Sequence, residues 1–263
     1  MKTLSFERLK ARLRTTQKKA YAHAFSRIMP YYIINEFPKS GGTWLSHMIA
    51  EALDMEFVPN VRLRLETRVV HGHFLHPLGL GNVVVIWRDP RDVLVSFYHH
   101  CFFRNEHRNA ELVRLMKLNL PFDDYWDVRA NLPQFIRFVS TTPFAPRFTW
   151  ISFVNAWAGR PGTVQTSYEK LRHDTASELA RIVGELTGVC LLPDRAAQVA
   201  ENHSFAKAKA KAKATSRTKE GVEMLFVREG STGGWRNHFS VEAIAELEAL
   251  GYGEPMRRLG YEL

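Results

Sequence analysis

The chain has 263 residues, of which 45% are hydrophobic and 24% are charged. This composition excludes an intrinsically disordered chain and a collagen-like repeat, because it supplies enough apolar side chains for a core. The 36 Lys and Arg outnumber the 27 Asp and Glu, which gives a formal net charge of +9. We therefore expect an anionic partner, and nucleic acid, anionic lipid, acidic glycan and a multiply phosphorylated cofactor all qualify at this point.

The first thirty residues are basic and predict an N-terminal helix. They hold neither an apolar run of about 7 to 15 residues, as in a signal peptide, nor an apolar span of about 20 residues. The two cysteines, Cys101 and Cys190, follow neither a disulfide pattern nor a metal-ligand spacing. We expect a cytoplasmic protein with no stable membrane insertion.

Apolar runs and turn residues alternate along the next part of the chain. β-Branched and aromatic runs predict strands over residues 31–37, 69–70, 83–87 and 163–166. Amphipathic runs predict helices over residues 43–53, 93–100 and 176–187. Gly188 is expected to end the last of these helices. Apolar strands separated by helices predict an α/β fold with a doubly wound parallel sheet covered on both faces, whose ligands bind at the carboxyl ends of the strands.

Residues 101–161 have a mostly helical pattern and predict an inserted helical layer. Large side chains at core spacing are Phe122, Trp126, Leu132, Phe135 and Phe138. Prolines, including Pro133, are expected to separate its helices. The acidic residues Asp123, Asp124 and Asp127 are interpreted as a solvated helix start, and no metal site is predicted.

Residues 206–214 read AKAKAKAKA and carry no large apolar side chain. Such a segment cannot build a core, so we predict a mobile lysine-rich loop over residues 206–221. The predicted organisation is a basic helix over residues 1–30 and a single domain over residues 31–263.

The turn after the first strand is typical of an anion site. It reads FPKSGGTWL over residues 37–45, so Lys39 and two glycines stand at the start of a helix. Backbone amides and the helix dipole attract an anion there, and the glycines allow close approach. The lysine precedes the glycines, unlike in the G-x-x-x-x-G-K-[ST] pattern, and no G-x-G-x-x-G is present. The turn is therefore P-loop-like in architecture, while ordinary ATP binding is disfavoured.

This turn resembles the P-K-S-G-T-T-W loop of sulfotransferases that use 3′-phosphoadenosine 5′-phosphosulfate (PAPS). Two further segments resemble the family in the expected order. Residues 88–99, RDPRDVLVSFYH, resemble its element for the 3′-phosphate, and residues 228–239, REGSTGGWRNHF, resemble its R-K-G-x-x-G-D-W-K signature. The chain is thus similar to cytosolic-type sulfotransferases. The resemblance implies a transferase that moves a sulfuryl group from PAPS to a hydroxyl or amine, releases 3′-phosphoadenosine 5′-phosphate (PAP) and needs no metal.

The resemblance also implies which residues bind the nucleotide. The 5′-phosphosulfate would lie against Lys39, Ser40, Gly41, Gly42 and Thr43. The 3′-phosphate would lie against Arg88, Ser96, Arg228 and Gly230. The adenine would lie between Trp44 and Phe205, with Tyr168 bonding it or shaping its pocket. Glu229 stands where the family has a lysine, which removes one positive contact, and Gly234 replaces the acid before Trp235.

The general base is sought in the segment His71-Gly72-His73 at the end of a predicted strand. His73 falls on the catalytic histidine of the family's K-T-H pattern, and an imidazole suits the acceptance of a hydroxyl proton near neutral pH. His71 replaces the lysine, as in the H-G-H of some glycan sulfotransferases, and is the second choice. Lys39 would neutralise the growing charge on the leaving phosphate.

The acceptor is expected to be a small molecule, a glycan or a glycolipid. The H-G-H pattern and the basic surface favour a carbohydrate or glycolipid, and the helical layer with the lysine-rich loop would shape the acceptor pocket. Arg236, Ser240 and Val241 partly resemble a family dimer motif, which leaves a homodimer open.

Two other functions agree with part of the sequence. A P-loop-like nucleotide kinase would share the strand–loop–helix architecture, but it does not need Arg88 with Ser96. A nucleic-acid-binding module would explain the net charge and the lysine run, but it would not explain any of the three motifs. We expect no nucleic-acid partner.

Overall fold

The computed structural model describes residues 2–29, 31–58, 66–103, 110–143, 146–207, 210 and 232–263, without the side chains of residues 2–12 and 14. The chain forms two compact units. The first consists of Met1–Glu36, Gly41–Ile86 and Gly159–Ala200. The second consists of Phe37–Ser40, Trp87–Ala158 and Glu201–Leu263.

The first unit is built on a sheet with the strand order β2-β1-β3-β4. The strands are β1 (Tyr31–Glu36), β2 (Arg68–Gly72), β3 (Val83–Trp87) and β4 (Thr163–Ser167). β1 pairs in parallel with β2 on one side and with β3 on the other, so the order reverses between β1 and β3. All residues of β3 are buried, which explains its continuous apolar sequence. The predicted strands and the α/β class with a parallel sheet and helices on both sides are confirmed.

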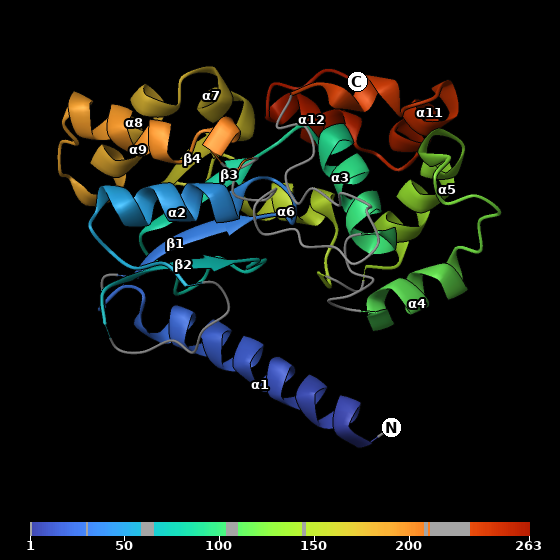
Figure 1. The fold of residues 1–263 in the computed structure, drawn as a ribbon, viewed down its shortest axis with the longest axis horizontal. Coiled ribbons are helices and arrows are strands. Elements are labelled where there is room, and N and C mark those ends of the chain that lie inside the picture. The colour runs from blue at the N-terminus through green and yellow to red at the C-terminus, as the bar shows by residue number, and fades with distance from the viewer. Residues whose placement is uncertain are drawn as a thin grey trace. The chain divides into compact units, whose positions relative to one another are not determined.

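The helices of this unit are α1 (Lys2–Phe25), α2 (Gly42–Ala52), α7 (Tyr168–His173), α8 (Thr175–Thr187) and most of α9 (Pro193–Asn202). Figure 1 shows α2 over the sheet and α1 beyond the edge strand β2. The buried side chains of α2, among them Leu45 and Met48, share a core with Ile34 of β1. Gly188 ends α8 with a φ of 73°, as predicted.

The second unit is helical. Its helices are α3 (Pro90–Phe102), α4 (Ala110–Asn119), α5 (Val128–Thr141), α6 (Trp150–Trp157), the 3-10 helix η1 (Gly234–Asn237), α11 (Val241–Ala249) and α12 (Gly253–Arg258). The predicted helical layer corresponds to α4, α5 and α6. Asp127 caps the start of α5, where its Oδ1 accepts a hydrogen bond from the N–H of Ala130 at 3.0 Å. This acidic helix start agrees with the prediction.

Two expectations for this layer are wrong. Trp126 is 67% exposed, because it lies in the turn before α5 and only stacks on the buried Phe103, with ring centroids 4.2 Å apart. Pro133 lies inside α5 and does not end it. A proline there removes one backbone hydrogen bond, which the burial of Leu132 and Phe135 on the same helix outweighs.

Several predictions concern residues outside the described ones. Arg228, Glu229, Gly230 and most of the lysine-rich loop lie in residues 208–209 and 211–231. The single domain over residues 31–263 stays a prediction. Among the described residues, no helix combines the length and the apolar character needed to cross a membrane.

Candidate active site

The glycine turn links the end of β1 to the start of α2. Lys39 has a φ of 79° and Gly41 a φ of 102°, both in the left-handed region. A Cβ on Gly41 would lie 2.8 Å from Cδ2 of Tyr168, so the position needs glycine for its space as well as for its φ. Gly41 caps α2 without a side chain. The first amides of α2 therefore need an acceptor from elsewhere.

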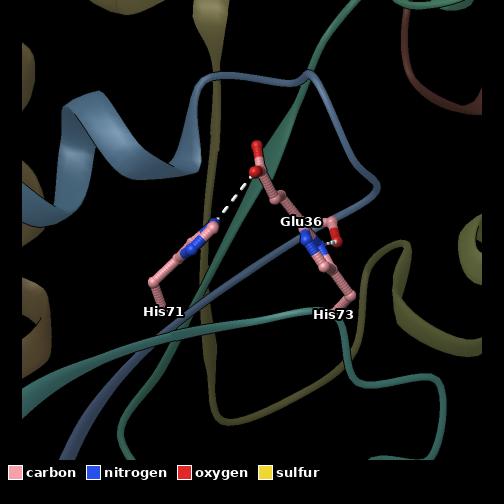
Figure 2. Close-up of side chains that lie close together, drawn as sticks. All are labelled: Glu36, His71 and His73. Carbon is pink, nitrogen blue, oxygen red and sulfur yellow. Dashed lines mark hydrogen bonds and ion pairs between the residues drawn. The ribbon is translucent and has the colours of Figure 1, made fainter. Parts of the chain in front are cut away.

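That acceptor is the buried carboxylate of Glu36, the last residue of β1. Its Oε2 accepts a hydrogen bond from the N–H of Gly42 at 2.6 Å, and its Oε1 lies 2.9 Å from Nε2 of His71. Figure 2 shows the carboxylate directed at His71. Burial alone would raise the pKa of Glu36, but the hydrogen bond and charge of His71, helped by His73 and Gly42, lower this pKa below its ordinary value. Glu36 is therefore a carboxylate anion at the start of a helix, where the dipole also favours it.

His73 follows β2 and packs beside the same carboxyl residue. Its Nδ1 lies 2.9 Å from the backbone oxygen of Glu36, and a carbonyl only accepts, so Nδ1 carries a proton. Burial lowers the pKa of His73 to about 4, against the raising effect of the Glu36 charge. At neutral pH the ring is therefore uncharged and the lone pair is on Nε2. The centroids of the His71 and His73 rings lie 5.2 Å apart, and the interplanar angle is 81° (Figure 2).

Helix α1 contributes one more group to this cluster. Nζ of Lys18 donates a hydrogen bond to the backbone oxygen of His71. Burial lowers the pKa of Lys18 to about 8. Sequence reasoning missed both Lys18 and Glu36. A lone acid between a buried strand and a glycine turn was a usable signal for Glu36, whereas nothing distinguished Lys18 from the other basic residues of the first helix.

Trp44 on α2 and Tyr168 on α7 lie together in the first unit. Their ring centroids are 5.7 Å apart at an interplanar angle of 63°. This brings together two of the three residues expected around the adenine. The third, Phe205, is half-buried in the second unit.

Arg88 contacts Lys39, and both residues belong to the second unit. Its Nη1 donates a hydrogen bond to the backbone oxygen of Lys39 at 3.2 Å. Ser96 lies on α3, eight residues further along, and is half-buried. The guanidinium therefore supports the peptide that carries the left-handed lysine.

The second and third sequence motifs meet in the second unit. Asp92 accepts hydrogen bonds from the N–H groups of Gly233 and Trp235 at 2.8 and 2.9 Å. The guanidinium of Arg91 lies 3.8 Å from the centre of the Trp235 ring. Sequence reasoning did not single out Asp92, although an acid in the first turn of a helix is a common acceptor for loop amides.

Comparison with known proteins identifies the family. The model of the family described as "Sulfotransferase domain" matches residues 80–260. The chain belongs to the sulfotransferase domain family. Its resemblance to that family, first seen in the three motifs, is confirmed.

Several curated sulfotransferases are similar to this chain. Sulfotransferase 2A1 of Homo sapiens is 25% identical over 192 residues, which cover 70% of this chain and 59% of that protein. Sulfotransferase 2A6 of Mus musculus is 29% identical over 180 residues, or 65% of this chain and 54% of the relative. The 3-beta-hydroxysteroid sulfotransferase of Cavia porcellus is 24% identical over 259 residues, or 84% and 81%. The chain thus spans less than two thirds of the length of the first two of these sulfotransferases.

Solved sulfotransferase structures share the fold. Mouse sulfotransferase SULT7A1 complexed with PAP has a TM-score of 0.65 at 18% identity and covers 93% of this chain and 90% of its own. Retinol dehydratase in complex with androsterone and the inactive cofactor PAP has a TM-score of 0.55 at 17% identity, with coverages of 92% and 86%. At these identities the likeness shows the sulfotransferase fold alone.

Proposed function

We propose that this chain transfers a sulfuryl group from PAPS to a hydroxyl or amine acceptor and releases PAP. Family membership supports this reaction, and the solved relatives named above were crystallised with PAP. The observation that carries the proposal is the turn from Lys39 to Gly42, which opens α2 next to the paired histidines. When bound, PAPS supplies the sulfuryl group and its phosphate leaving group.

The residues of the turn fit the phosphate end of such a nucleotide. Gly41 leaves no side chain over the start of α2, and the helix dipole favours an anion there. The N–H of Gly42 is already held by the Glu36 carboxylate, so Gly42 contributes space to the proposed site. We assign the binding of the 5′-phosphosulfate to the Lys39 ammonium, the hydroxyls of Ser40 and Thr43, and the open backbone of Gly41.

We assign the 3′-phosphate to Arg88 and Ser96, because a guanidinium can hold a phosphate through two parallel hydrogen bonds. Arg228 and Gly230 complete this assignment from the family pattern, while Glu229 opposes an anion by its charge. For the adenine we assign Trp44 and Phe205 as stacking partners and Tyr168 as a wall beside Trp44, which agrees with the contact of the Trp44 and Tyr168 rings.

We assign the role of general base to His73. Its Nδ1 proton is held by the Glu36 backbone oxygen, which leaves Nε2 able to accept the proton of the acceptor hydroxyl. The imidazolium that forms is stabilised by the nearby Glu36 carboxylate. His71 lies with its Nε2 2.9 Å from Oε1 of this carboxylate and holds it in place. Lys39 would neutralise charge on the departing phosphate oxygen.

A small-molecule alcohol is the acceptor class we favour. One relative is named as a 3-beta-hydroxysteroid sulfotransferase, and one solved relative is a retinol dehydratase in complex with androsterone. Transfer from labelled PAPS to sterols, phenols and glycans distinguishes the acceptor classes. Transfer to glycans alone would contradict a small-molecule acceptor and would favour the carbohydrate expected from the H-G-H pattern.

Calorimetric titration of the purified chain with PAP, ATP and AMP, without magnesium, tests the nucleotide assignment. We expect PAP to bind more tightly than ATP. In Arg88→Ala we expect this tighter binding of PAP to be lost. Arg160→Ala, which removes an exposed guanidinium, serves as the control. Equal affinity for PAP and ATP in the unmodified chain would overturn the proposal.

A further inference from the structure

We propose that Glu36, His71 and His73 form a binding site for a divalent transition metal ion, with Zn²⁺ as the occupant, and that the bound ion inhibits the enzyme. Each of the three side chains offers one ligand atom, and these atoms all lie within 4.8 Å of one another. Figure 2 shows the three side chains gathered at the ends of β1 and β2. The binding claim stands on these groups alone, whereas the inhibition rests on the proposed function.

The donor set suits zinc better than magnesium or calcium. Two imidazoles and one carboxylate are ligands that zinc takes in many proteins, whereas Mg²⁺ and Ca²⁺ prefer oxygen alone. Bonds of about 2.0 to 2.2 Å in a tetrahedron place ligand atoms about 3.3 to 3.6 Å apart. Oε1 of Glu36 and Nε2 of His71 are already 2.9 Å apart. Closing the site needs a shift of about 1.5 Å at most, which side-chain rotation supplies.

The groups behind these ligands are arranged as they are around bound metals. A metal-binding histidine usually donates its other ring N–H to a carbonyl or carboxylate. His73 does so through Nδ1 to the backbone oxygen of Glu36, which leaves Nε2 for the ion. The second oxygen of Glu36 is held by the Gly42 N–H, so the carboxylate is already oriented. Little reorganisation is therefore needed at two of the three ligands.

Lys18 opposes the ion. Its ammonium donates a hydrogen bond to the backbone oxygen of His71 and places a positive charge beside the site. Removing that charge should strengthen the binding of any cation. Lys18→Met keeps a long apolar stem at this position and therefore makes a specific test of the site.

The ion would block the proposed reaction at one atom. Nε2 of His73 has a single lone pair, which either accepts the acceptor's proton or binds the metal. Zinc should therefore inhibit sulfuryl transfer, and it should do so at lower concentration in Lys18→Met.

Titration of the purified full chain with Co²⁺ alone, without nucleotide, tests the site. We expect the visible absorption of tetrahedral cobalt with one equivalent bound, and displacement of the cobalt by Zn²⁺. A Cys190→Ser background removes the exposed thiol as a competing ligand. In Glu36→Gln, His71→Ala and His73→Ala we expect affinity to fall at least about tenfold. His76→Ala removes an exposed imidazole and should leave the spectrum unchanged.

No cobalt spectrum in the unmodified chain would overturn the site. So would cobalt binding retained in His71→Ala and His73→Ala variants whose circular dichroism is that of the unmodified chain. Should either alanine variant fail to fold, Glu36→Gln and Lys18→Met test the site. Cobalt affinity should fall in Glu36→Gln and rise in Lys18→Met, and the opposite changes would overturn the site. The two proposals fail separately, since a cobalt spectrum in a chain without transferase activity removes only the proposed function. Transfer that zinc does not inhibit, in a chain that binds it, removes the inhibitory role.

Discussion

The carboxylate of Glu36 accepts a hydrogen bond from the backbone N–H of Gly42 at 2.6 Å. The chain thus places its own anion at the first turn of α2, in the turn where the nucleotide phosphate is proposed to bind. Two anions near one helix start repel each other. The cationic groups around them, Lys39 above all, must outweigh that repulsion.

Replacing this anion by its neutral isostere should strengthen nucleotide binding. Glu36→Gln keeps an oxygen for the Gly42 N–H but removes the negative charge. We expect the dissociation constant for PAP, measured by calorimetry, to fall about tenfold. Glu185→Gln, at an exposed position of α8, is the matched control and should change nothing. Weaker PAP binding in Glu36→Gln would mean that the carboxylate supports the site.

The left-handed conformation of Lys39 predicts opposite effects on stability and activity. At a φ of 79°, glycine is less strained than any residue with a Cβ. Lys39→Gly should therefore be more stable than Lys39→Ala by about 1 kcal/mol in urea unfolding. Both variants lack the ammonium, and both should lose turnover by about 100-fold or more. Equal stability of the two variants would show that the turn relaxes around position 39.

Loss of the proposed base should separate binding from turnover. His73→Ala is expected to lower turnover by about 100-fold to 10,000-fold, the range of a general base. PAP affinity should change little, because the imidazole is assigned to the acceptor's proton. Turnover by rapid-quench assay and PAP affinity by calorimetry measure the two effects. Retained turnover in His73→Ala would transfer the role of base to His71.

An ion pair away from the site gives the chain a pH-dependent stability. Glu178 accepts hydrogen bonds from Thr166 Oγ1 at 2.6 Å and from Arg181 Nε at 2.9 Å. Burial would raise the pKa of Glu178, but the bonds from Arg181 and Thr166 outweigh it and lower the pKa below 4.5. A lowered folded pKa stabilises the chain above the unfolded value, and this stabilisation is lost as pH falls through the folded value.

Glu178→Gln should therefore be less stable than the unmodified chain at pH 7, and the difference should shrink as pH falls below about 4.5. Urea unfolding of the two chains at pH 7 and at a pH below about 4.5 measures this difference in stability. Glu185 also contacts Arg181, but its side chain is 51% exposed. Glu185→Gln should therefore lower the stability less than Glu178→Gln does. A difference between Glu178→Gln and the unmodified chain that stays constant with pH would contradict this origin.

Local features were predictable from the sequence because they depend on neighbours along the chain. The apolar run over residues 83–87 is β3, and Gly188 ends α8 where its conformational freedom is needed. Trp126 shows the limit of periodicity, since its spacing matched a core face while its ring is 67% exposed and stacks on the buried Phe103. Trp126 lies in the turn before α5, where helical spacing does not say which side chains face the core.

The cluster around Glu36 could not be predicted in this way. It depends on the parallel register that sets Ile34 of β1 opposite His71 of β2, and on α1 reaching the same strand through Lys18. Neither contact follows from residues near each other in the sequence. The motifs did predict that His71 and His73 belong to one site. That Glu36 contacts both of them, His71 through its carboxylate and His73 through its backbone oxygen, is visible only in the folded chain.

The hydrogen bond from Arg88 to the Lys39 carbonyl gives one side chain two tasks. A guanidinium has five N–H donors, so it can keep this carbonyl and still bind a phosphate. In Arg88→Ala the turn around Lys39, which is proposed to hold the other end of the nucleotide, would also lose its anchor. AMP, which has no 3′-phosphate, should therefore bind more weakly to Arg88→Ala as well. The loss of PAP affinity in this variant should exceed the loss expected from one phosphate contact.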